Sequence, residues 1–301
     1  MIERDDRLRQ VHEYEEFETI DIIHLGWSSD IKYDVRTKSG ERCVLRISDM
    51  SYFETKKKEF ETIQLFNALG FEMSKAICFR KAKDESFCYM LLSYIEGESL
   101  EEALPKLDVE RQYQLGIEAG LILRQIHELK VPTGFKKIID IREKKLKQLQ
   151  AYESSLHRMP DDQTVIDYIK SNIHYIGNQE PTFQHGDFHP GNLILTKEGK
   201  VGVIDFNRWD IADPYEEFYK LECFSSAISV PFSKGQIDAY FNHKVPNDFW
   251  RTLAVYAAHV AVYSIHWAEK FGDEDIQNMK KMYEMILNHY DYFKKIIPCW
   301  Y

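Results

Sequence analysis

The segment between residues 183 and 207 most constrains the fold, because it places charged side chains beside residues that favour burial. It reads F-Q-H-G-D-F-H-P-G-N-L-I-L and, after a short hairpin, I-D-F-N. Asp187 and Asn192 are five positions apart, and Asp205 follows the hairpin. A carboxylate is costly to bury unless it is paired or bound to a metal. We therefore expect Asp187, Asn192 and Asp205 to belong to one charged site.

The oxygen atoms of these side chains suit a hard cation. Mg²⁺ prefers oxygen ligands and usually keeps waters and substrate phosphates as the rest of its shell. Asn192 and Asp205 would supply an amide and a carboxylate oxygen, which leaves Asp187 to face an attacking hydroxyl. Protein kinases use the same parts, an H-R-D-x-x-x-x-N loop followed by D-F-G. His185-Gly186-Asp187, Asn192 and Asp205-Phe206-Asn207 stand at the matching positions.

The first part of the chain has the pattern of a sheet with one inserted helix. Short runs rich in β-branched and aromatic residues, separated by turn residues, predict strands. The residues from 51 to 69 have apolar side chains at steps of three and four, which predicts a helix that ends before Gly70. The predicted strands are Thr19–Leu25, Ile31–Arg36, Arg42–Ile47, Ala76–Arg80 and Phe87–Leu92.

The remainder of the chain has mainly helical patterns. Asp108–Lys130 carries one apolar face, Ile141–Leu156 is rich in Lys and Gln, and Asp161–Ile176 is amphipathic. We predict an α+β bilobal protein-kinase-like fold, with a small N-terminal antiparallel β-sheet lobe containing one helix and a larger helical C-terminal lobe. The predicted domains are residues 1–95, which bind nucleotide, and residues 96–301, which carry catalysis and substrate binding. Small ligands often bind in clefts at such domain boundaries.

The composition excludes several classes of protein. The formal charge of −10 argues against nucleic acid, whose binding depends on basic groups that contact phosphates. The five cysteines contain no CxxC, which favours reduced thiols. The first residues, M-I-E-R-D-D-R-L-R-Q, lack the apolar core of a signal peptide, and no stretch approaches the roughly 20 apolar residues that span a bilayer. We expect a cytoplasmic protein without membrane association, and no pattern indicates a protein partner.

The H-G-D-x-x-x-x-N and I-D-F motifs resemble those of the aminoglycoside phosphotransferase family. This family belongs to a group of small-molecule kinases that includes choline kinase and homoserine kinase and is similar to protein kinases in fold. The resemblance extends from the strand pair near residue 20 to roughly residue 225. It implies that Asp187 orients the substrate hydroxyl and accepts its proton. It also implies that Asn192 and Asp205 bind Mg²⁺.

The same resemblance implies a set of nucleotide-binding residues in the first lobe. The turn Gly26-Trp27-Ser28-Ser29 resembles the loop over the phosphates, so Ser28 and Ser29 are expected to contact them. Arg46 stands where the family most often has a phosphate-binding Lys, and Glu59 matches the Glu that pairs with it. The main chain of Ser93 and Ile95 matches the hinge that binds the nucleobase.

Two positions depart from the pattern. An Arg in place of Lys differs in reach and geometry, although the planar guanidinium of Arg46 could hold two phosphate oxygens. Asn207 replaces the Gly that follows Asp-Phe in protein kinases, where that Gly belongs to regulation by an activation loop. Only seven residues separate Asp205 from Asp213, which is too few for such a loop.

Less specific interpretations exist for each motif. Asp187 and Asn192 could belong to a plain turn, since H-P-G-N is typical of turns. His185 and His189 could bind a metal, but their spacing is a weak signal. Arg46 and Glu59 could form a surface ion pair of little value. Acidic residues near position 215, including the candidate substrate contacts Asp210 and Glu217, could instead complement the dipole of a helix.

The sequence therefore predicts a small-molecule kinase. It would transfer the γ-phosphoryl group of ATP or GTP, with Mg²⁺, to a hydroxyl of a small and cationic substrate. The family name and the acidic charge favour an aminoglycoside-type antibiotic, which would make the enzyme one of antibiotic resistance. A metabolic kinase for choline, homoserine, a thio-sugar or a fructosamine is the closest alternative. The other alternative is a nucleotide-binding protein without catalysis. It is supported only by the presence of Arg46 where the family most often has Lys.

Overall fold

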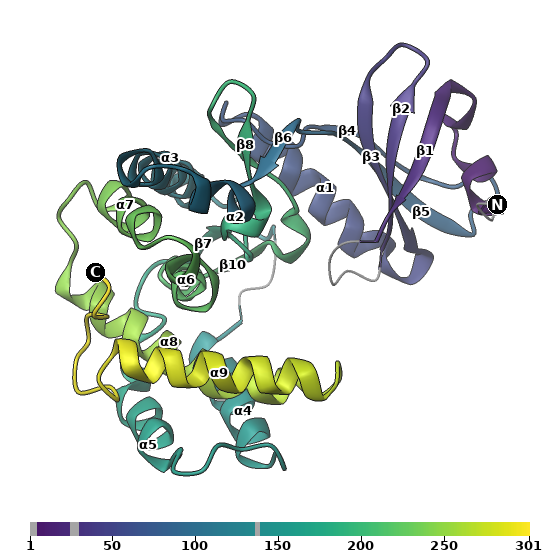
Figure 1. Cartoon of the computed structure of the whole chain (residues 1–301). Coiled ribbons are helices and arrows are strands. Elements are labelled where there is room, and N and C mark those ends of the chain that lie inside the picture. The colour runs from purple at the N-terminus through teal and green to yellow at the C-terminus, as the bar shows by residue number, and fades with distance from the viewer. Residues whose placement is uncertain (1–4, 25–29, 136–138) are drawn as a thin grey trace. The chain divides into compact units, whose positions relative to one another are not determined.

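The computed structural model describes residues 5–24, 30–135 and 139–301, which fall into two compact units (Figure 1). The first unit contains Met1–Glu98 and Ile194–Trp209, and the second contains Ser99–Leu193 and Asp210–Tyr301. Residues 194–209 thus pack with the N-terminal unit, although the sequence places them in the second predicted domain. The predicted boundary at residue 95 stays a prediction.

A five-stranded antiparallel sheet forms the centre of the first unit. Its strand order is β1-β2-β3-β5-β4, and α1 follows β3 as the sequence predicts. The strand β5 lies between β3 and β4, which explains its uninterrupted apolar run: six of its seven residues are buried. The bounds are β1 (Phe17–Ile23), β2 (Ile31–Thr37), β3 (Arg42–Asp49), α1 (Phe53–Asn67), β4 (Ala76–Lys81) and β5 (Phe87–Ser93).

Apolar residues cover the sheet of this unit. Figure 1 shows α1 running alongside it, and the buried side chains of α1 include Phe60, Ile63 and Phe66. Leu8 and Val11, from the N-terminal segment, join a core cluster with residues of β2, β3 and β5. The turn between β2 and β3 contains Gly40, whose φ of +88° is one that glycine adopts without strain.

An isolated parallel bridge between Met73 and Val203 connects a distant part of the sequence to the first unit. Val203 donates its N–H to the Glu72 carbonyl at 2.9 Å and accepts from the Ser74 N–H at 3.2 Å. These bonds fix the chain two residues before Asp205. A smaller sheet has the order β6-β8-β9, with bounds β6 (Gly97–Ser99), β8 (Leu193–Thr196) and β9 (Val201–Val203).

The second unit is helical, with one pair of short strands. A large core cluster joins α4, α5, α8 and α9, and α8 and α9 pack side by side (Figure 1). The bounds are α2 (Leu100–Ala103), α3 (Val109–Glu128), α4 (Ile141–Glu153), α5 (Gln163–Asn172), β7 (Thr182–Gln184), β10 (Asp210–Ala212), α6 (Ser226–Ile228), α7 (Val230–Tyr240), α8 (Asn247–Ala268) and α9 (Asp273–His289).

The helices α3 and α7 approach each other closely because glycines lie at their contact. A Cβ atom added to Gly116 would lie 2.1 Å from the Phe232 carbonyl oxygen, and one added to Gly120 would lie 2.3 Å from that of Gln236. Both neighbours are main-chain atoms, so a methyl group there requires one helix to move.

We expect Gly120→Ala to lower the free energy of unfolding by about 1–3 kcal/mol, the usual cost of overpacking. This cost outweighs the gain of about 1 kcal/mol that Ala brings to a helix interior. Urea unfolding measures the difference, and Gln114→Ala, at an exposed position of α3, is the matched control. A variant as stable as the wild type would show that α7 can shift at no cost.

Candidate active site

The predicted catalytic residue, Asp187, lies on a tight loop of the second unit. The strand β7 leads directly into it, and Gly186 has a φ of +80°, which favours glycine. His185 is fully buried, and its Nδ1 accepts the Asp187 N–H at 3.2 Å. The Asp187 side chain remains 19% exposed, so its carboxylate can be reached from solvent.

Asn192 is fixed against the same loop. Its Nδ2 donates to the Asp187 carbonyl oxygen at 2.9 Å, at the end of the short helix Pro190–Asn192. A carbonyl can only accept, so the atom facing it must be the amide nitrogen. The Asn192 Oδ1 is then the atom that remains for a cation, as the predicted metal-binding role requires. The structure thus brings Asp187 and Asn192 together.

Two basic side chains lie next to the Asp187 carboxylate. The Lys220 Nζ is 2.5 Å from Asp187 Oδ1, and the His189 Nε2 is 3.7 Å from the same atom. The His189 Nδ1 accepts the Gly191 N–H at 3.1 Å, and its Nε2 lies 3.3 Å from the Asn192 Nδ2.

These contacts set the protonation of the pair. Burial by itself would raise the pKa of Asp187, but the hydrogen bond from His189 and the charge of Lys220 lower that pKa well below its usual range. Burial would likewise lower the pKa of Lys220, whereas its neighbours Tyr219 and Asp187 raise that pKa above its usual range. Asp187 is therefore a carboxylate and Lys220 an ammonium at neutral pH.

Glu217 lies beside the main chain of the catalytic loop. It is 4% exposed, and its two oxygens accept the N–H groups of Gly186, at 2.5 Å, and His185, at 3.1 Å. The His127 Nε2 lies 3.1 Å from the same carboxylate. The Glu217 carboxylate is therefore buried and anchors the main chain of the catalytic loop, while its predicted contact with substrate stays a prediction. Asp210 is half-buried at the start of β10 and stays a candidate substrate contact.

Glu217→Gln should lower the free energy of unfolding by about 1–3 kcal/mol, because an NH₂ group would face a main-chain N–H and leave it unsatisfied. Thermal unfolding measures this loss. If Glu217 bound substrate instead, the variant would keep its stability and only its affinity for the acceptor would change.

Asp205 belongs to the first unit, where it follows β9. Its φ of +61° and ψ of +66° are left-handed, a conformation that is uncommon for residues other than glycine and often marks functional sites. The Lys32 Nζ is 3.2 Å from Asp205 Oδ2. Lys32 stands opposite Arg46 in the pairing of β2 with β3, so both cations start from neighbouring positions of the sheet.

Arg46 lies in a buried ion cluster. Its Nη1 is 2.6 Å from Glu59 Oε1, and its Nη2 is 2.5 Å from Asp30 Oδ2. Lys56 contacts both carboxylates, at 2.6 Å from Asp30 and 3.0 Å from Glu59, and the Ser48 hydroxyl donates to Asp30 at 2.7 Å. The cluster therefore contains two cations and two anions in balance.

The ion pair between Arg46 and Glu59 is present and is not a surface pair, since Arg46 is 3% and Glu59 2% exposed. Burial would lower the pKa of Arg46, but the charges of Glu59, Asp205 and Asp30 raise that pKa above its usual value. The direct bonds of Arg46 go to carboxylates of the cluster, and its part in phosphate binding stays a prediction.

The predicted hinge lines a pocket of about 260 Å³ in the first unit. The Ser93 N–H and hydroxyl both bond to the main chain of Lys75, at 2.9 and 2.8 Å, which fixes this stretch. The lining residues are Glu72, Met73, Lys75, Ser93, Tyr94, Ile95, Glu96, Thr196, Lys197 and Glu198. Ser28 and Ser29, predicted to contact phosphates, lie outside the described residues.

The sequence did not indicate Lys220, Lys32, Asp30 or Lys56. Lys56 begins a run of three lysines that has the appearance of a solvated helix face. Lys220 carries a weak signal, because it stands between Tyr219 and Leu221 and three residues after Glu217. A lysine among apolar residues of a helix needs a partner, but the sequence does not say which.

The fold and the two parts of the site define a phosphotransferase with an alcohol group as acceptor and a protein-kinase-like fold. The model of the phosphotransferase enzyme family matches residues 19–256. The chain belongs to this family. No curated protein matches the chain significantly.

Solved structures confirm the predicted fold class. The ADP-bound aminoglycoside phosphotransferase APH(2'')-Ib superposes with a TM-score of 0.69 at 17% identity, over 94% of this chain and 99% of that chain. The amicoumacin kinase hAmiN, in complex with AMP-PNP, Ca²⁺ and Ami, gives a TM-score of 0.65 at 14% identity, over 92% and 90%. A GDP and kanamycin complex of APH(2'')-IIIa gives 0.67 at 16%, over 90% and 93%. Within the described residues, none of the helices has the length and apolarity needed to cross a membrane.

Proposed function

We propose that this enzyme transfers the γ-phosphoryl group of ATP or GTP to a hydroxyl of a small molecule, with Asp187 accepting the hydroxyl proton. The arrangement around Asp187 carries this proposal. Its carboxylate is ionised, partly exposed and held by Lys220, and its carbonyl holds Asn192. A carboxylate that is fixed in place and has access to solvent is what a general base requires.

We propose Asn192 and Asp205 as the protein ligands of a Mg²⁺ ion that binds together with the nucleotide phosphates. Each offers an oxygen, the donor atom that Mg²⁺ prefers. The described residues contain no group of three or more His, Cys, Asp or Glu side chains that could hold a metal by themselves. That result is compatible with Mg²⁺, which takes one or two protein ligands and completes its shell with phosphates and water. When bound, the ion would neutralise phosphate charge during transfer.

The pocket beside Ser93 and Ile95 supports binding of a nucleobase. It lies within the first unit, and its lining residues include Ser93 and Ile95 of the predicted hinge. Relatives of the same fold were solved with ADP, GDP and AMP-PNP. All five cysteines of the chain are free, which supports the proposed cytoplasmic location, where thiols stay reduced.

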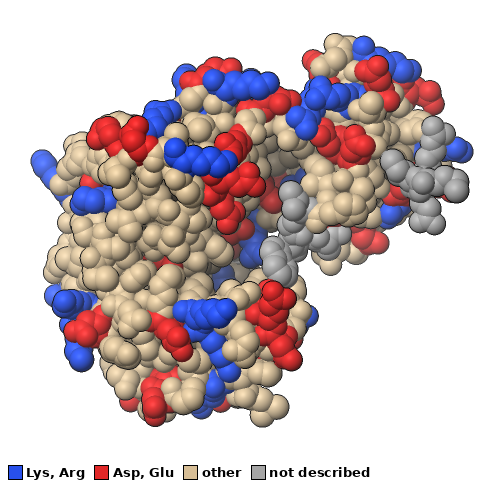
Figure 2. All heavy atoms as spheres, in the orientation of Figure 1, with Lys and Arg blue, Asp and Glu red and all other residues tan. Residues whose placement is uncertain are grey.

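An aminoglycoside-type acceptor is the first class to test. Structures of similar fold contain hygromycin B and kanamycin, and the net charge of −10 favours a cationic substrate. On the face shown in Figure 2, however, acidic and basic side chains are interspersed, so the charge there is not concentrated in one acidic area. Such an acceptor would make the protein an enzyme of antibiotic resistance.

The engaged carboxylates of the second unit favour a second candidate, a kinase for a neutral or weakly charged metabolite. Glu216 is paired with Lys145 at 2.7 Å, and Glu217 binds the catalytic loop. Glu222 is fully buried and accepts hydrogen bonds from Tyr290, at 2.9 Å, and Trp300, at 3.2 Å. The amino groups of a cationic substrate would therefore have to bind carboxylates other than these three.

The test is a panel of acceptors incubated with Mg²⁺ and either ATP or GTP, followed by mass spectrometry of the products. The panel contains kanamycin and hygromycin B, together with choline, homoserine, a thio-sugar and a fructosamine. A phosphorylated aminoglycoside would support the first class, and a phosphorylated metabolite alone would support the second. If no acceptor is phosphorylated and no ADP or GDP is released, although nucleotide binds, the proposed catalysis is wrong.

A further inference from the structure

We propose that Lys220 is a positioning residue of the phosphoryl-transfer site, whose ammonium group holds the Asp187 carboxylate in the orientation that the acceptor hydroxyl requires. This inference rests on the proposed function. The family motifs lie at residues 185–192 and 204–206, and they assign no role to Lys220.

Lys220 is a buried cation with one carboxylate beside it. The residue is 5% exposed, and Asp187 Oδ1, at 2.5 Å, is the only ion-pair partner found for it in the described parts of the chain. A buried ammonium is costly unless it is paired, so this bond strongly restricts where the Asp187 carboxylate can lie. A short charge-assisted hydrogen bond also fixes geometry better than a neutral one.

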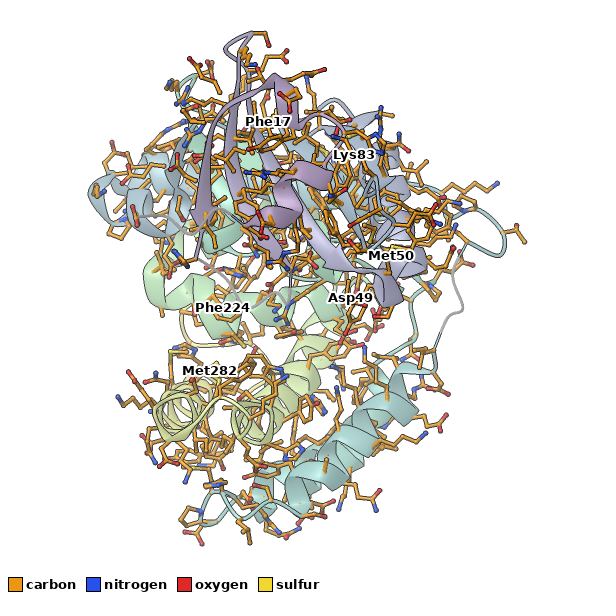
Figure 3. All side chains as sticks on the ribbon, turned by 90° about the vertical axis from the view of Figure 1, so that its right-hand side faces the viewer. Phe17, Asp49, Met50, Lys83, Phe224 and Met282 are labelled. Atoms are coloured by element: carbon orange, nitrogen blue, oxygen red, sulfur yellow. The ribbon has the colours of Figure 1, made fainter. Side chains whose placement is uncertain are left out.

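Two aromatic rings also lie close to the ammonium group of Lys220. The Lys220 Nζ lies 5.0 Å from the ring centre of Tyr219 and 5.3 Å from that of Phe224, within the range of cation–π attraction. Phe224, labelled in Figure 3, stacks on His189 with ring centres 4.5 Å apart. His189 in turn faces Asp187 Oδ1. The four side chains Lys220, Phe224, His189 and Asp187 thus form a closed ring of contacts.

The segment that carries Lys220 holds the catalytic loop at two points. Glu217, three residues earlier, binds the N–H groups of Gly186 and His185, while Lys220 binds the carboxylate of Asp187. Residues three apart share a face of a helix, so one face contacts both the main chain and the reacting side chain. The next residues, Leu221–Ser225, form a π-helix, an unusual conformation that is frequent at functional sites.

The step in which Lys220 would act is the attack of the acceptor on the γ-phosphorus. The hydroxyl oxygen bonds to that phosphorus while its proton moves to Asp187. The bond from the γ-phosphorus to the bridging oxygen breaks, and its electron pair leaves with the nucleoside diphosphate. Lys220 makes and breaks no covalent bond. Displacement of a reacting group by about 1 Å can cost roughly 100-fold in rate, so loss of Lys220 should slow this step.

The experiment measures ADP release from Mg-ATP with water as acceptor, which needs no knowledge of the substrate. Lys220→Met should lower kcat by about 10–100-fold and change the KM for ATP by less than about threefold. Lys220→Arg, which keeps the charge, should recover part of the loss. The matched control is Lys145→Met, which removes a buried lysine paired with Glu216 at 2.7 Å in the same unit. The kcat of Lys145→Met, expressed per folded molecule, should equal that of the wild type.

A double variant separates positioning from a merely structural role. If Lys220 acts through Asp187, adding Lys220→Met to Asp187→Asn should slow ADP release by less than about threefold further. Because Lys220→Met could fail to fold, Lys220→Gln, which keeps a hydrogen-bond donor, is measured by the same criteria.

Three results would overturn the inference. They are an unchanged kcat in Lys220→Met or Lys220→Gln, a loss that Lys220→Arg does not relieve, and a loss that multiplies fully with that of Asp187→Asn. The proposed function itself fails if the wild type binds nucleotide but releases no ADP, or if Asp187→Asn retains ADP release, so its failure is distinguishable from that of the role of Lys220.

Discussion

Asp187→Asn should reduce turnover by about 100- to 10,000-fold, the scale on which enzymes lose rate when a general base is removed. This corresponds to about 3–5 kcal/mol of activation free energy, at 1.36 kcal/mol for each tenfold change. The amide keeps the size of the side chain but cannot accept the hydroxyl proton. Steady-state ADP release, with water or the identified acceptor, measures the loss.

Nucleotide binding provides the control for this variant. The hinge pocket and Asp205 lie in the first unit, whereas Asp187 lies in the second, so the affinity for Mg-AMP-PNP measured by calorimetry should change little. Turnover close to that of the wild type would contradict the assignment of Asp187. Tight nucleotide binding in a wild-type protein that releases no ADP would instead support a nucleotide-binding protein without catalysis.

Local patterns were sufficient to predict most of the fold. The predicted strands near residues 31, 42, 76 and 87 and the helix after β3 are all present, because each depends on residues close in the sequence. The membership of residues 194–209 in the first unit could not be predicted in this way. It depends on the bonds of Val203 to Glu72 and Ser74, which no short-range pattern encodes.

The same distinction between local and long-range contacts applies to the candidate site. Asp187 and Asn192 were found because a short loop fixes their spacing, and their hydrogen bond spans five residues. Lys220 pairs with Asp187 across 33 residues, and Lys32 pairs with Asp205 across 173. The bonds of Glu217 could not be predicted for the same reason, since the sequence shows an acidic residue near a helix start but not the main-chain N–H groups that it binds. The partners of buried charges are determined by tertiary contacts, so they can be identified only in the folded chain.

Replacement of Asp30 should have the largest effect on stability of the substitutions considered. Burial would raise the pKa of Asp30, but the charges of Arg46 and Lys56 outweigh it and lower this pKa to about 2. The carboxylate is therefore favoured by folding, and its contribution is present above the ordinary pKa of 3.8 and lost as the pH falls towards 2. A lowering of this size corresponds to about 2 kcal/mol at neutral pH.

Asp30→Asn should cost more than that, about 3–5 kcal/mol, because it leaves Arg46 and Lys56 buried opposite Glu59 alone. Urea unfolding at pH 7 measures the loss, and the difference from the wild type should shrink between pH 4 and pH 2, where Asp30 itself becomes protonated. The matched control is Asp34→Asn on the same sheet. Asp34 pairs with Arg42 at 2.5 Å, but both side chains are about a quarter exposed, so its loss should cost only about 0–1 kcal/mol. Equal losses in the two variants, or a loss for Asp30→Asn that does not vary with pH, would mean that the charge of Asp30 does not stabilise the cluster.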